Sequence, residues 1–295
     1  NKVRMSLRSF ASLKMTNLTC FLYNMIIMKE YDFYIVPTPI GNLGDITNRA
    51  LEVLRFVDII ACEDIRVTQK LLNHFEIKTK CVSYHKFNEK ERVNYFLNIL
   101  NEGKKIALVS DAGTPLFCDP GAVIVDELRK NGFSVTSLAG ANAVVTFLSQ
   151  VPRLDEDFVF VGFLPRTKQQ LENLLSKYKS TDMVFYDSPN RLLNTLETIH
   201  ACRQNSRVAI GRELTKVFEE IIIDDTKNVL QHFQTSTLKG EIVGLVFREQ
   251  TTDTVDFSDK IELLKAKGFK AKEISTILAE LFNANKNDIY KQCIK

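Results

Sequence analysis

The sequence lacks the features that mark membrane-spanning, disulfide-rich or zinc-binding proteins. No run of eighteen apolar residues occurs, so no membrane span is expected. The six cysteines are scattered without a CxxC pair, and the four histidines form no HExxH spacing. These patterns argue against a disulfide framework and against a metal site. With 45% hydrophobic and 25% charged residues, the composition favours a globular cytoplasmic protein.

The first 27 residues lack acidic side chains altogether. They carry four basic residues, so the remainder of the chain has a net charge of −1 although the whole chain has +3. This composition is typical of a transit peptide, whereas a secretory signal fits less well because polar residues interrupt each apolar stretch. We favour a third interpretation, in which residues 1–27 are a non-native or disordered extension that precedes an initiator at Met28. Any polyanionic partner must then be held by local basic patches.

From Asp32 onward, short apolar segments alternate with amphipathic ones, which predicts an α/β protein with right-handed crossovers. We expect two α/β domains, at 28–150 and 155–250, the first with a mostly parallel sheet. A small helical domain is expected at 258–295, with helices over 259–267, 271–282 and 287–294.

Two helices of the first domain have a predicted cap or buried side. Asp45 is expected to cap the first of them. The buried side of that helix should hold Ile46, Ala50, Val53, Leu54 and Val57. The buried side of the next helix should hold Val67, Leu71 and Phe75.

Four loops that follow predicted strands of the first domain are rich in glycine, proline and acids: PTPIGN, CEDIR, SDAGTP and LAGAN. Ligands of open parallel sheets bind outside the carboxyl ends of the strands. One such loop would be ordinary, but four at one edge favour a site for a nucleotide-like molecule. Because GxGxxG and GxxxxGK[ST] are both missing, a phosphate cradle is not expected. Carboxylates and carbonyls would suit a cationic sulfonium.

Eight motifs in register carry a family resemblance: PTPIGNLGDITNRALEVL, CEDIR, SYHKFNEKER, VSDAGTPLFCDPG, GFLPR, FYDSPNR, GRELTKVFEEI and KGEIVGLV. Together they extend from about Tyr34 to Val246, and NKNDIY adds a weaker match near the C-terminus. The sequence resembles the bacterial 16S ribosomal RNA 2′-O-ribose methyltransferases, which have the tetrapyrrole-methylase fold. The resemblance implies S-adenosylmethionine as cofactor, bound between two α/β domains of a homodimer. It also implies that the substrate is a cytidine in the decoding region of the small ribosomal subunit.

The resemblance also assigns roles to individual residues. The cofactor-binding residues that it implies are Pro39, Gly41, Asp111, Gly113, Thr114, Pro115, Gly140, Ala141, Phe185, Tyr186, Glu213, Leu214 and Thr215. The candidate contacts to substrate RNA are Arg66, Arg191, Arg212 and Lys216. For Arg66, a salt bridge with the neighbouring acids is an equal alternative. Arg212 and Lys216 could instead pair with Glu213 and Glu219.

A ribose hydroxyl is a weak nucleophile, so a general base or strong hydrogen-bond acceptor should assist it. Glu63, Asp64 and His85 are the catalytic candidates, and Asp111 could also act as the base. The sequence does not choose among them, and His85 could equally be a structural loop histidine.

Two other functions remain open at this stage. One is a methyltransferase of the same fold that acts on a tetrapyrrole or a protein side chain. The other is a noncatalytic RNA-binding assembly factor that keeps the pocket. The segments FYDSPNR and GRELTKVFEE favour the ribosomal RNA enzymes over the first alternative. A test of methyl incorporation distinguishes an enzyme from a noncatalytic assembly factor, whereas a test of cofactor binding does not.

Overall fold

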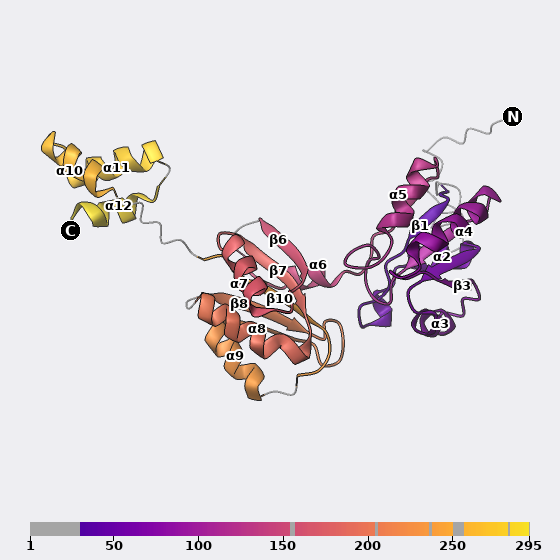
Figure 1. Ribbon diagram of the computed structural model, residues 1–295. Coiled ribbons are helices and arrows are strands. Elements are labelled where there is room, and N and C mark those ends of the chain that lie inside the picture. The colour runs from indigo at the N-terminus through magenta and orange to yellow at the C-terminus, as the bar shows by residue number, and fades with distance from the viewer. Residues whose placement is uncertain are drawn as a thin grey trace, which may run out of the picture. The chain divides into compact units, whose positions relative to one another are not determined.

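The computed structural model describes residues 30–153, 157–203, 206–235, 238–249, 257–282 and 284–294. The extension predicted for residues 1–27 lies outside this part of the chain. Contacts divide the molecule into two units, whose elements are labelled in Figure 1. The first unit runs up to Phe147 and includes Leu214–Val217. The second unit comprises Leu148–Glu213 and the chain from Phe218 onward.

The first unit is built on a five-stranded sheet with the order β3-β2-β4-β1-β5. All of its neighbouring strands are parallel, as the sequence predicts. The strands are β1 (Phe33–Ile35), β2 (Ile59–Cys62), β3 (Lys80–Ser83), β4 (Ile106–Val109) and β5 (Val135–Ser137). Every residue of β1, β2 and β4 is buried, because helices cover both faces of a parallel sheet.

Two apolar clusters hold the helices of the first unit against opposite faces of this sheet. One contains residues of α2 (Asn48–Phe56) and α3 (Ile65–His74), together with Ile60 and Cys62 of β2. The other contains residues of α4 (Glu89–Asn101) and α5 (Ala122–Lys130), together with Ile59 and Ala61. The side chains of β2 therefore alternate between the two cores, as the pleat of a strand requires. A short helix, α6 (Ala143–Leu148), follows β5.

Two local predictions for these helices are wrong. Thr47 caps α2, accepting a hydrogen bond from the Ala50 amide at 3.1 Å. Asp45 instead ends a 3-10 turn, Leu43–Asp45, that Asn42 caps, so the helix starts two residues later than a cap at Asp45 would require. On α3 the buried residues are Thr68 and Leu72.

The side of α3 that packs on the sheet lies one residue further along the helix than the predicted side. Val67 is 39% exposed. Leu71 and Phe75 are half-buried. The helix has apolar residues on two adjacent lines, and the sheet packs against the line through Thr68 and Leu72.

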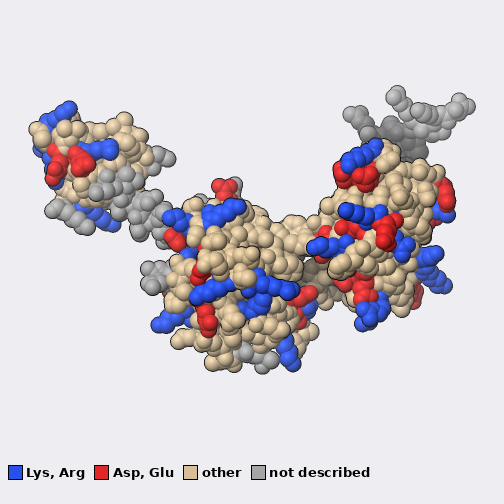
Figure 2. All heavy atoms as spheres, viewed as in Figure 1, with Lys and Arg blue, Asp and Glu red and all other residues tan. Residues whose placement is uncertain are grey.

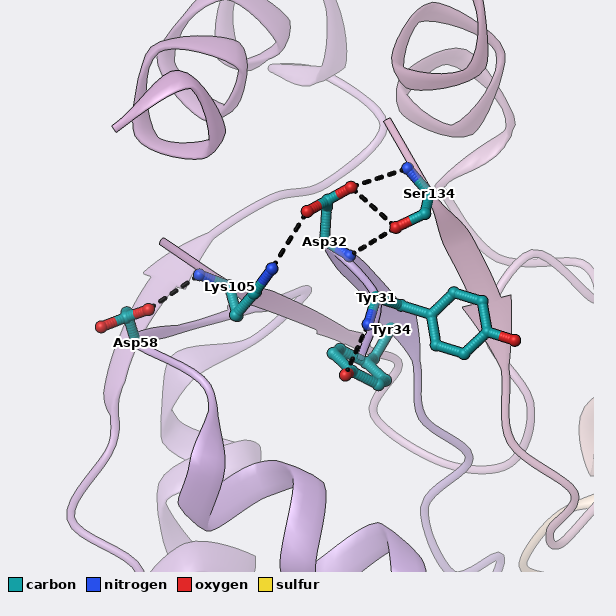
Figure 3. Close-up of polar contacts among 6 residues, drawn as sticks. All are labelled: Tyr31, Asp32, Tyr34, Asp58, Lys105 and Ser134. Atoms are coloured by element: carbon teal, nitrogen blue, oxygen red, sulfur yellow. Dashed lines mark hydrogen bonds and ion pairs between the residues drawn. The ribbon is translucent and has the colours of Figure 1, made fainter. Parts of the chain in front are cut away.

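Residues just before four strands form a polar knot at the amino edge of this sheet (Figure 3). The Asp32 carboxylate accepts hydrogen bonds from the Ser134 amide at 2.8 Å and from the Ser134 hydroxyl at 2.7 Å. It also pairs with the Lys105 ammonium at 3.1 Å. The Lys105 amide donates to the Asp58 carboxylate at 2.7 Å. The knot thus joins the starts of β1, β2, β4 and β5.

We expect Asp32→Asn to destabilise the protein by about 1–2 kcal/mol at pH 7, because hydrogen bonds to a charged group are lost. Burial raises the pKa of Asp32, but the hydrogen bonds from Ser134 and the Lys105 charge outweigh it and hold the pKa below its usual value. A lowered carboxylate pKa stabilises the fold above the unfolded-state pKa of about 4, and this stabilisation is lost as the pH falls further. Urea unfolding at several pH values should therefore show the difference between the two proteins narrowing near pH 4. Asp126→Asn, in an exposed pair with Lys130, is the control. A constant difference would contradict the assignment.

The second unit contains a mixed five-stranded sheet with the order β6-β7-β10-β8-β9. Its strands are β6 (Phe158–Phe163), β7 (Asp182–Asp187), β8 (Arg207–Arg212), β9 (Glu220–Asp225) and β10 (Ile242–Val246). The β6–β7 pair is parallel, and the other pairs are antiparallel. The helices α7 (Lys168–Lys177), α8 (Pro189–Cys202) and α9 (Thr226–Thr235) contribute to its apolar core.

Three C-terminal helices have an apolar core of their own. They are α10 (Ser258–Ala266), α11 (Ala271–Phe282) and α12 (Lys286–Cys293), each within one residue of its predicted bounds. Their core consists of Phe257, Ile261, Ile274, Leu278, Ile289 and Cys293. That this segment is a separate domain stays a prediction, as do the predicted domain boundaries. In the described ranges, no helix is both long and apolar enough to cross a membrane.

Candidate active site

Hydrogen bonds join the loops at the carboxyl edge of the first sheet into one connected structure. Thr38 and Gly113 exchange two backbone hydrogen bonds of 2.9 Å, which link the loops after β1 and β4. The Thr114 hydroxyl donates to the Ala141 carbonyl at 2.9 Å, which adds the loop after β5. The Asp64 amide donates to the Asp111 carboxylate at 3.1 Å, which adds the loop after β2. The four glycine- and acid-rich loops that the sequence singles out therefore come together.

The loop after β4 has an unusual backbone. Leu116 and Cys118 both have positive φ values, of 69° and 72°, which side chains with a Cβ rarely adopt. Such conformations cost roughly 1–3 kcal/mol each and persist only where the surroundings fix them. Gly121 also has a positive φ, of 138°. No larger residue fits there, because a Cβ would lie 2.6 Å from a Leu116 methyl group. The loop is held in one shape, as a ligand-binding loop should be.

Two glycines at this edge lie where another residue would clash. A Cβ on Gly41 would lie 2.5 Å from Cγ of Lys216 and 2.8 Å from the Leu214 carbonyl oxygen. The neighbouring Asn42 amide donates to the Thr215 hydroxyl at 3.1 Å. A Cβ on Gly140 would lie 2.6 Å from Cβ of Pro37. The segment Leu214–Val217 therefore packs directly on the PIGN loop, within the first unit.

The predicted cofactor residues are divided between the two units. The members in the first unit are Pro39, Gly41, Asp111, Gly113, Thr114, Pro115, Gly140, Ala141, Leu214 and Thr215. Phe185, Tyr186 and Glu213 belong to the second unit. Phe185 is fully buried in that core, where its ring packs on Gly244. The Tyr186 ring lies edge-on to Phe160, with 5.1 Å between centroids, and Glu213 accepts a hydrogen bond from the Glu241 amide at 3.0 Å.

Three carboxyl groups at the edge of the first sheet have raised pKa values. Burial raises the pKa of Asp119 to about 6, and the charges of Glu63 and Asp111 add to this effect, against a hydrogen bond from Ser110. Burial, followed by the Asp111 charge, raises the pKa of Glu63. Burial, followed by the Asp64 charge, also raises the pKa of Asp111. A group of carboxylates that repel one another favours a cation, and its members titrate closer to neutral pH.

Asp64 differs from these three carboxylates because its charge is fully engaged. Its carboxylate caps α3 by accepting from the Arg66 amide at 2.8 Å, and it forms a 2.7 Å ion pair with the Arg66 guanidinium. These hydrogen bonds lower the pKa of Asp64 to about 2. Arg66 thus makes the salt bridge that the sequence leaves as an alternative, although its side chain is 87% exposed. Asp64 is poorly suited to accept a proton.

His85 stands in the loop after β3, at the same edge of the sheet. Its Nδ1 atom accepts a hydrogen bond from the Phe87 amide at 3.3 Å, so the neutral ring carries its proton on Nε2. The ring is close enough to Glu63 for its charge to lower the pKa of that carboxyl group. His85 is therefore placed to donate a hydrogen bond, and it is a weaker candidate for the base than Glu63.

The arginines predicted to contact RNA in the second unit make intramolecular ion pairs. Arg191 pairs with the fully buried carboxylate of Asp187 and donates to the Leu164 carbonyl at 3.0 Å. Arg212 pairs with Glu220 at 2.9 Å, so its acidic partner is neither Glu213 nor Glu219. Both arginines thus have a structural role, and a role in RNA binding stays a prediction for them.

Sequence reasoning missed several polar residues of the edge. Asp119 is absent from the predicted set, although burial raises its pKa to about 6. Thr38 and Ser110 are also absent, although the Thr38 hydroxyl donates to the Ser110 carbonyl at 3.1 Å beneath the loops. The only signal for Asp119 is its place in CDPG, because a sequence does not reveal burial.

The fold is matched by known proteins. A family model for tetrapyrrole (corrin/porphyrin) methylases matches residues 32–229, about two thirds of the chain. The chain belongs to this methylase family. A solved structure of a cobalt precorrin-4 methyltransferase from cobalamin biosynthesis superposes with a TM-score of 0.56 and 18% identity, covering 73% of this chain and 94% of that one. At such low identity the likeness shows the fold alone.

Closer relatives of this methylase are curated proteins named ribosomal RNA small subunit methyltransferase I. The protein of Halalkalibacterium halodurans is 40% identical over 267 residues, which cover 87% of this chain and 92% of the relative. That of Buchnera aphidicola is 39% identical over 271 residues, which cover 89% of this chain and 96% of the relative. The matches thus extend over nearly the whole length of both relatives.

Proposed function

We propose that this methylase transfers a methyl group from S-adenosylmethionine to the 2′-hydroxyl of a cytidine in the decoding region of small-subunit ribosomal RNA. The observation that carries the proposal is the carboxylate group at the loop edge of a tetrapyrrole-methylase domain. The names of the 39–40% identical relatives support the substrate class. The position of the methyl group and the target nucleotide rest on the motif resemblance.

The loop edge fits the proposed cofactor in charge. Asp111, Glu63 and Asp119 provide negative charge that a sulfonium would neutralise. Gly41 and Gly140 let Leu214 and Pro37 pack closely against the loops that carry the predicted cofactor residues. When bound, S-adenosylmethionine supplies an electrophilic methyl group. The residues that would hold it are the predicted set of the first unit, in which Asp111 would supply negative charge opposite the sulfonium.

Glu63 is the residue best suited to accept the proton of the ribose hydroxyl. Its carboxylate makes no hydrogen bond within the described residues, whereas Asp64 is paired with Arg66 and Asp111 accepts from the Asp64 amide. Burial raises the pKa of Glu63 and makes it a better base than an exposed glutamate. His85 would donate through Nε2 and orient the hydroxyl. The remaining task of the protein is to align the ribose oxygen with the methyl group.

The pH dependence of the methylation rate should reveal the ionisation of Glu63. A base must be ionised to accept a proton, so the rate should fall as the pH drops through the raised pKa of Glu63. At saturating S-adenosylmethionine, we expect Asp111→Asn to move this acid limb to lower pH, because it removes a negative charge that raises the pKa of Glu63. The measurement is the single-turnover rate between pH 5 and pH 8, with the exposed Asp126→Asn as control. An acid limb that stays in place or moves to higher pH in Asp111→Asn would be inconsistent with this arrangement.

The function is tested by transfer of labelled methyl groups to small ribosomal subunits that lack the native modification. We expect one methyl group per subunit, and nuclease digestion should recover it as 2′-O-methylcytidine. A methylated base would overturn the position, and methylation of a tetrapyrrole or a protein instead would overturn the substrate class. Cofactor binding without any transfer would favour the noncatalytic assembly factor.

The proposal includes a homodimer that works in the cytoplasm, where ribosomes are assembled. Exposed apolar side chains at Val217 and Phe218 are surfaces that a second copy could cover. Acidic and basic groups are interspersed on the face seen in Figure 2. RNA would therefore be held by local contacts rather than by a uniform basic field. Sedimentation of the full chain tests the oligomeric state.

A further inference from the structure

The loop after β3 carries an aromatic ring that is almost entirely in solvent. Phe87 is 93% exposed, more than any other phenylalanine among the described residues. It stands four residues after β3 ends, at the edge of the sheet where Glu63 and Asp111 lie. Its ring lies 6.1 Å from the His85 ring, at an interplanar angle of 63°. Covering this ring with a binding partner would remove apolar surface from water, which is favourable.

The backbone beneath Phe87 is fixed. The His85 amide donates to the Asn88 side chain at 2.8 Å, and the Asn88 amide donates to the His85 carbonyl at 2.9 Å. Tyr84 precedes this turn and Glu89 follows it. The hydroxyl of the buried Tyr84 donates to the Glu89 carboxylate at 3.0 Å. The same carboxylate accepts from the Gly121 amide at 2.9 Å, which ties the turn to the loop after β4. Phe87 is therefore presented by a braced turn.

The charges around Phe87 indicate the kind of partner. Lys86 and Lys90 flank it, both are exposed, and neither forms an ion pair with another described residue. An exposed ring between free ammonium groups matches an unpaired nucleotide, whose base stacks while its phosphates meet the lysines. A protein partner that covered Phe87 would have to be acidic as well as apolar.

We propose that Phe87 is a stacking platform for an unpaired base of the RNA substrate, held beside the carboxylates of the active edge. The inference rests on the proposed function for its substrate class. Stacking would hold a nucleotide out of its helix, which a 2′-hydroxyl needs in order to reach Glu63. Lys86 and Lys90 would contact the flanking phosphates. Phe87 acts as a positioning residue, and it takes no part in proton transfer.

Kinetics on small ribosomal subunits provide the first test. Removal of a base-stacking ring weakens binding roughly 5- to 100-fold. We therefore expect Phe87→Ala to raise KM for subunits by about that factor, with S-adenosylmethionine affinity unchanged. Phe87→Tyr should restore KM, and Phe87→Leu, which is apolar without a π face, should not. If Phe87→Ala keeps KM within twofold of the native value, the proposal is overturned.

The chain contains no tryptophan, so a single introduced indole reports on its own surroundings. In Phe87→Trp, an unpaired oligocytidylate should quench the fluorescence, and the same strand in an RNA duplex should not. Phe56→Trp is the matched control, because Phe56 is a 51% exposed ring of the same unit that ends α2 just before β2, at the opposite edge of the sheet. Equal quenching at both positions would overturn a specific platform.

Two further outcomes separate this inference from others. If Phe87→Ala turns a dimer into a monomer, the ring is a contact between copies, and base stacking is overturned. If the native chain transfers no methyl group to small subunits, the proposed function fails. Selective quenching of the Phe87→Trp variant by unpaired RNA would then still support the platform, and its absence would overturn it too.

Discussion

Replacing Glu63 with glutamine is expected to lower the single-turnover rate of methyl transfer by about 100-fold or more, because a positioned general base contributes roughly 10²- to 10⁴-fold. The variant keeps the shape of the side chain and loses its negative charge and its capacity to accept a proton. Affinity for S-adenosylmethionine should stay within a few-fold, since Asp111 and Asp119 retain their charges. The residual rate should lose the acid limb that ionisation of Glu63 causes and increase with hydroxide concentration.

Glu91→Gln is the matched control for this experiment, because Glu91 is an exposed glutamate in the first turn of α4. It should methylate at the native rate. A Glu63→Gln enzyme with full activity would remove Glu63 from the base position. Asp111, the other candidate with a raised pKa, would then be the next to test. Loss of cofactor binding together with the rate would instead place Glu63 on the cofactor side.

The sequence predicts the scaffold of the first unit well, because its signals are local and repetitive. Fully apolar segments such as Ile59–Cys62 can form only strands buried on both faces, and the helices between them impose parallel pairing. Errors occur where two local solutions compete. At Asp45 a 3-10 turn capped by Asn42 displaces the helix start, and on α3 two adjacent apolar lines are available to the sheet.

The candidate site is predicted less completely because its chemistry depends on burial and on neighbours distant in sequence. Glu63, Asp64 and Asp111 are equivalent acids in the sequence. In the structure Arg66 engages Asp64, and burial leaves Glu63 and Asp111 easier to protonate. Burial raises the pKa of Asp119 to about 6, and the charges of two acids add to this effect. Glu63 is distant in the sequence, whereas Asp111 is on the same loop. Likewise, no pattern around Arg191 reveals the buried carboxylate of Asp187 as its partner.

Replacing Asp111 with asparagine is expected to weaken S-adenosylmethionine binding by roughly tenfold, because a carboxylate that pairs with a sulfonium in a solvated site contributes on the order of 1–2 kcal/mol. The substitution retains an oxygen that can accept the hydrogen bond from the Asp64 amide. The junction between the loops after β2 and β4 should therefore survive, and thermal unfolding should change little. The loss of affinity then measures the charge.

Comparison of two ligands makes this test specific for electrostatics. S-Adenosylhomocysteine has a neutral thioether where S-adenosylmethionine has a sulfonium, so a lost carboxylate should weaken binding of S-adenosylmethionine and leave that of S-adenosylhomocysteine nearly unchanged. Calorimetry on the native protein and on Asp111→Asn gives both affinities. Asp45→Asn removes an exposed carboxylate from another loop of the same edge and serves as the control. An equal loss for both ligands would mean that Asp111 acts through the shape of its loop. No loss for either ligand would remove Asp111 from the cofactor site, and the raised pKa of its carboxyl group would then reflect only its neighbours and its burial.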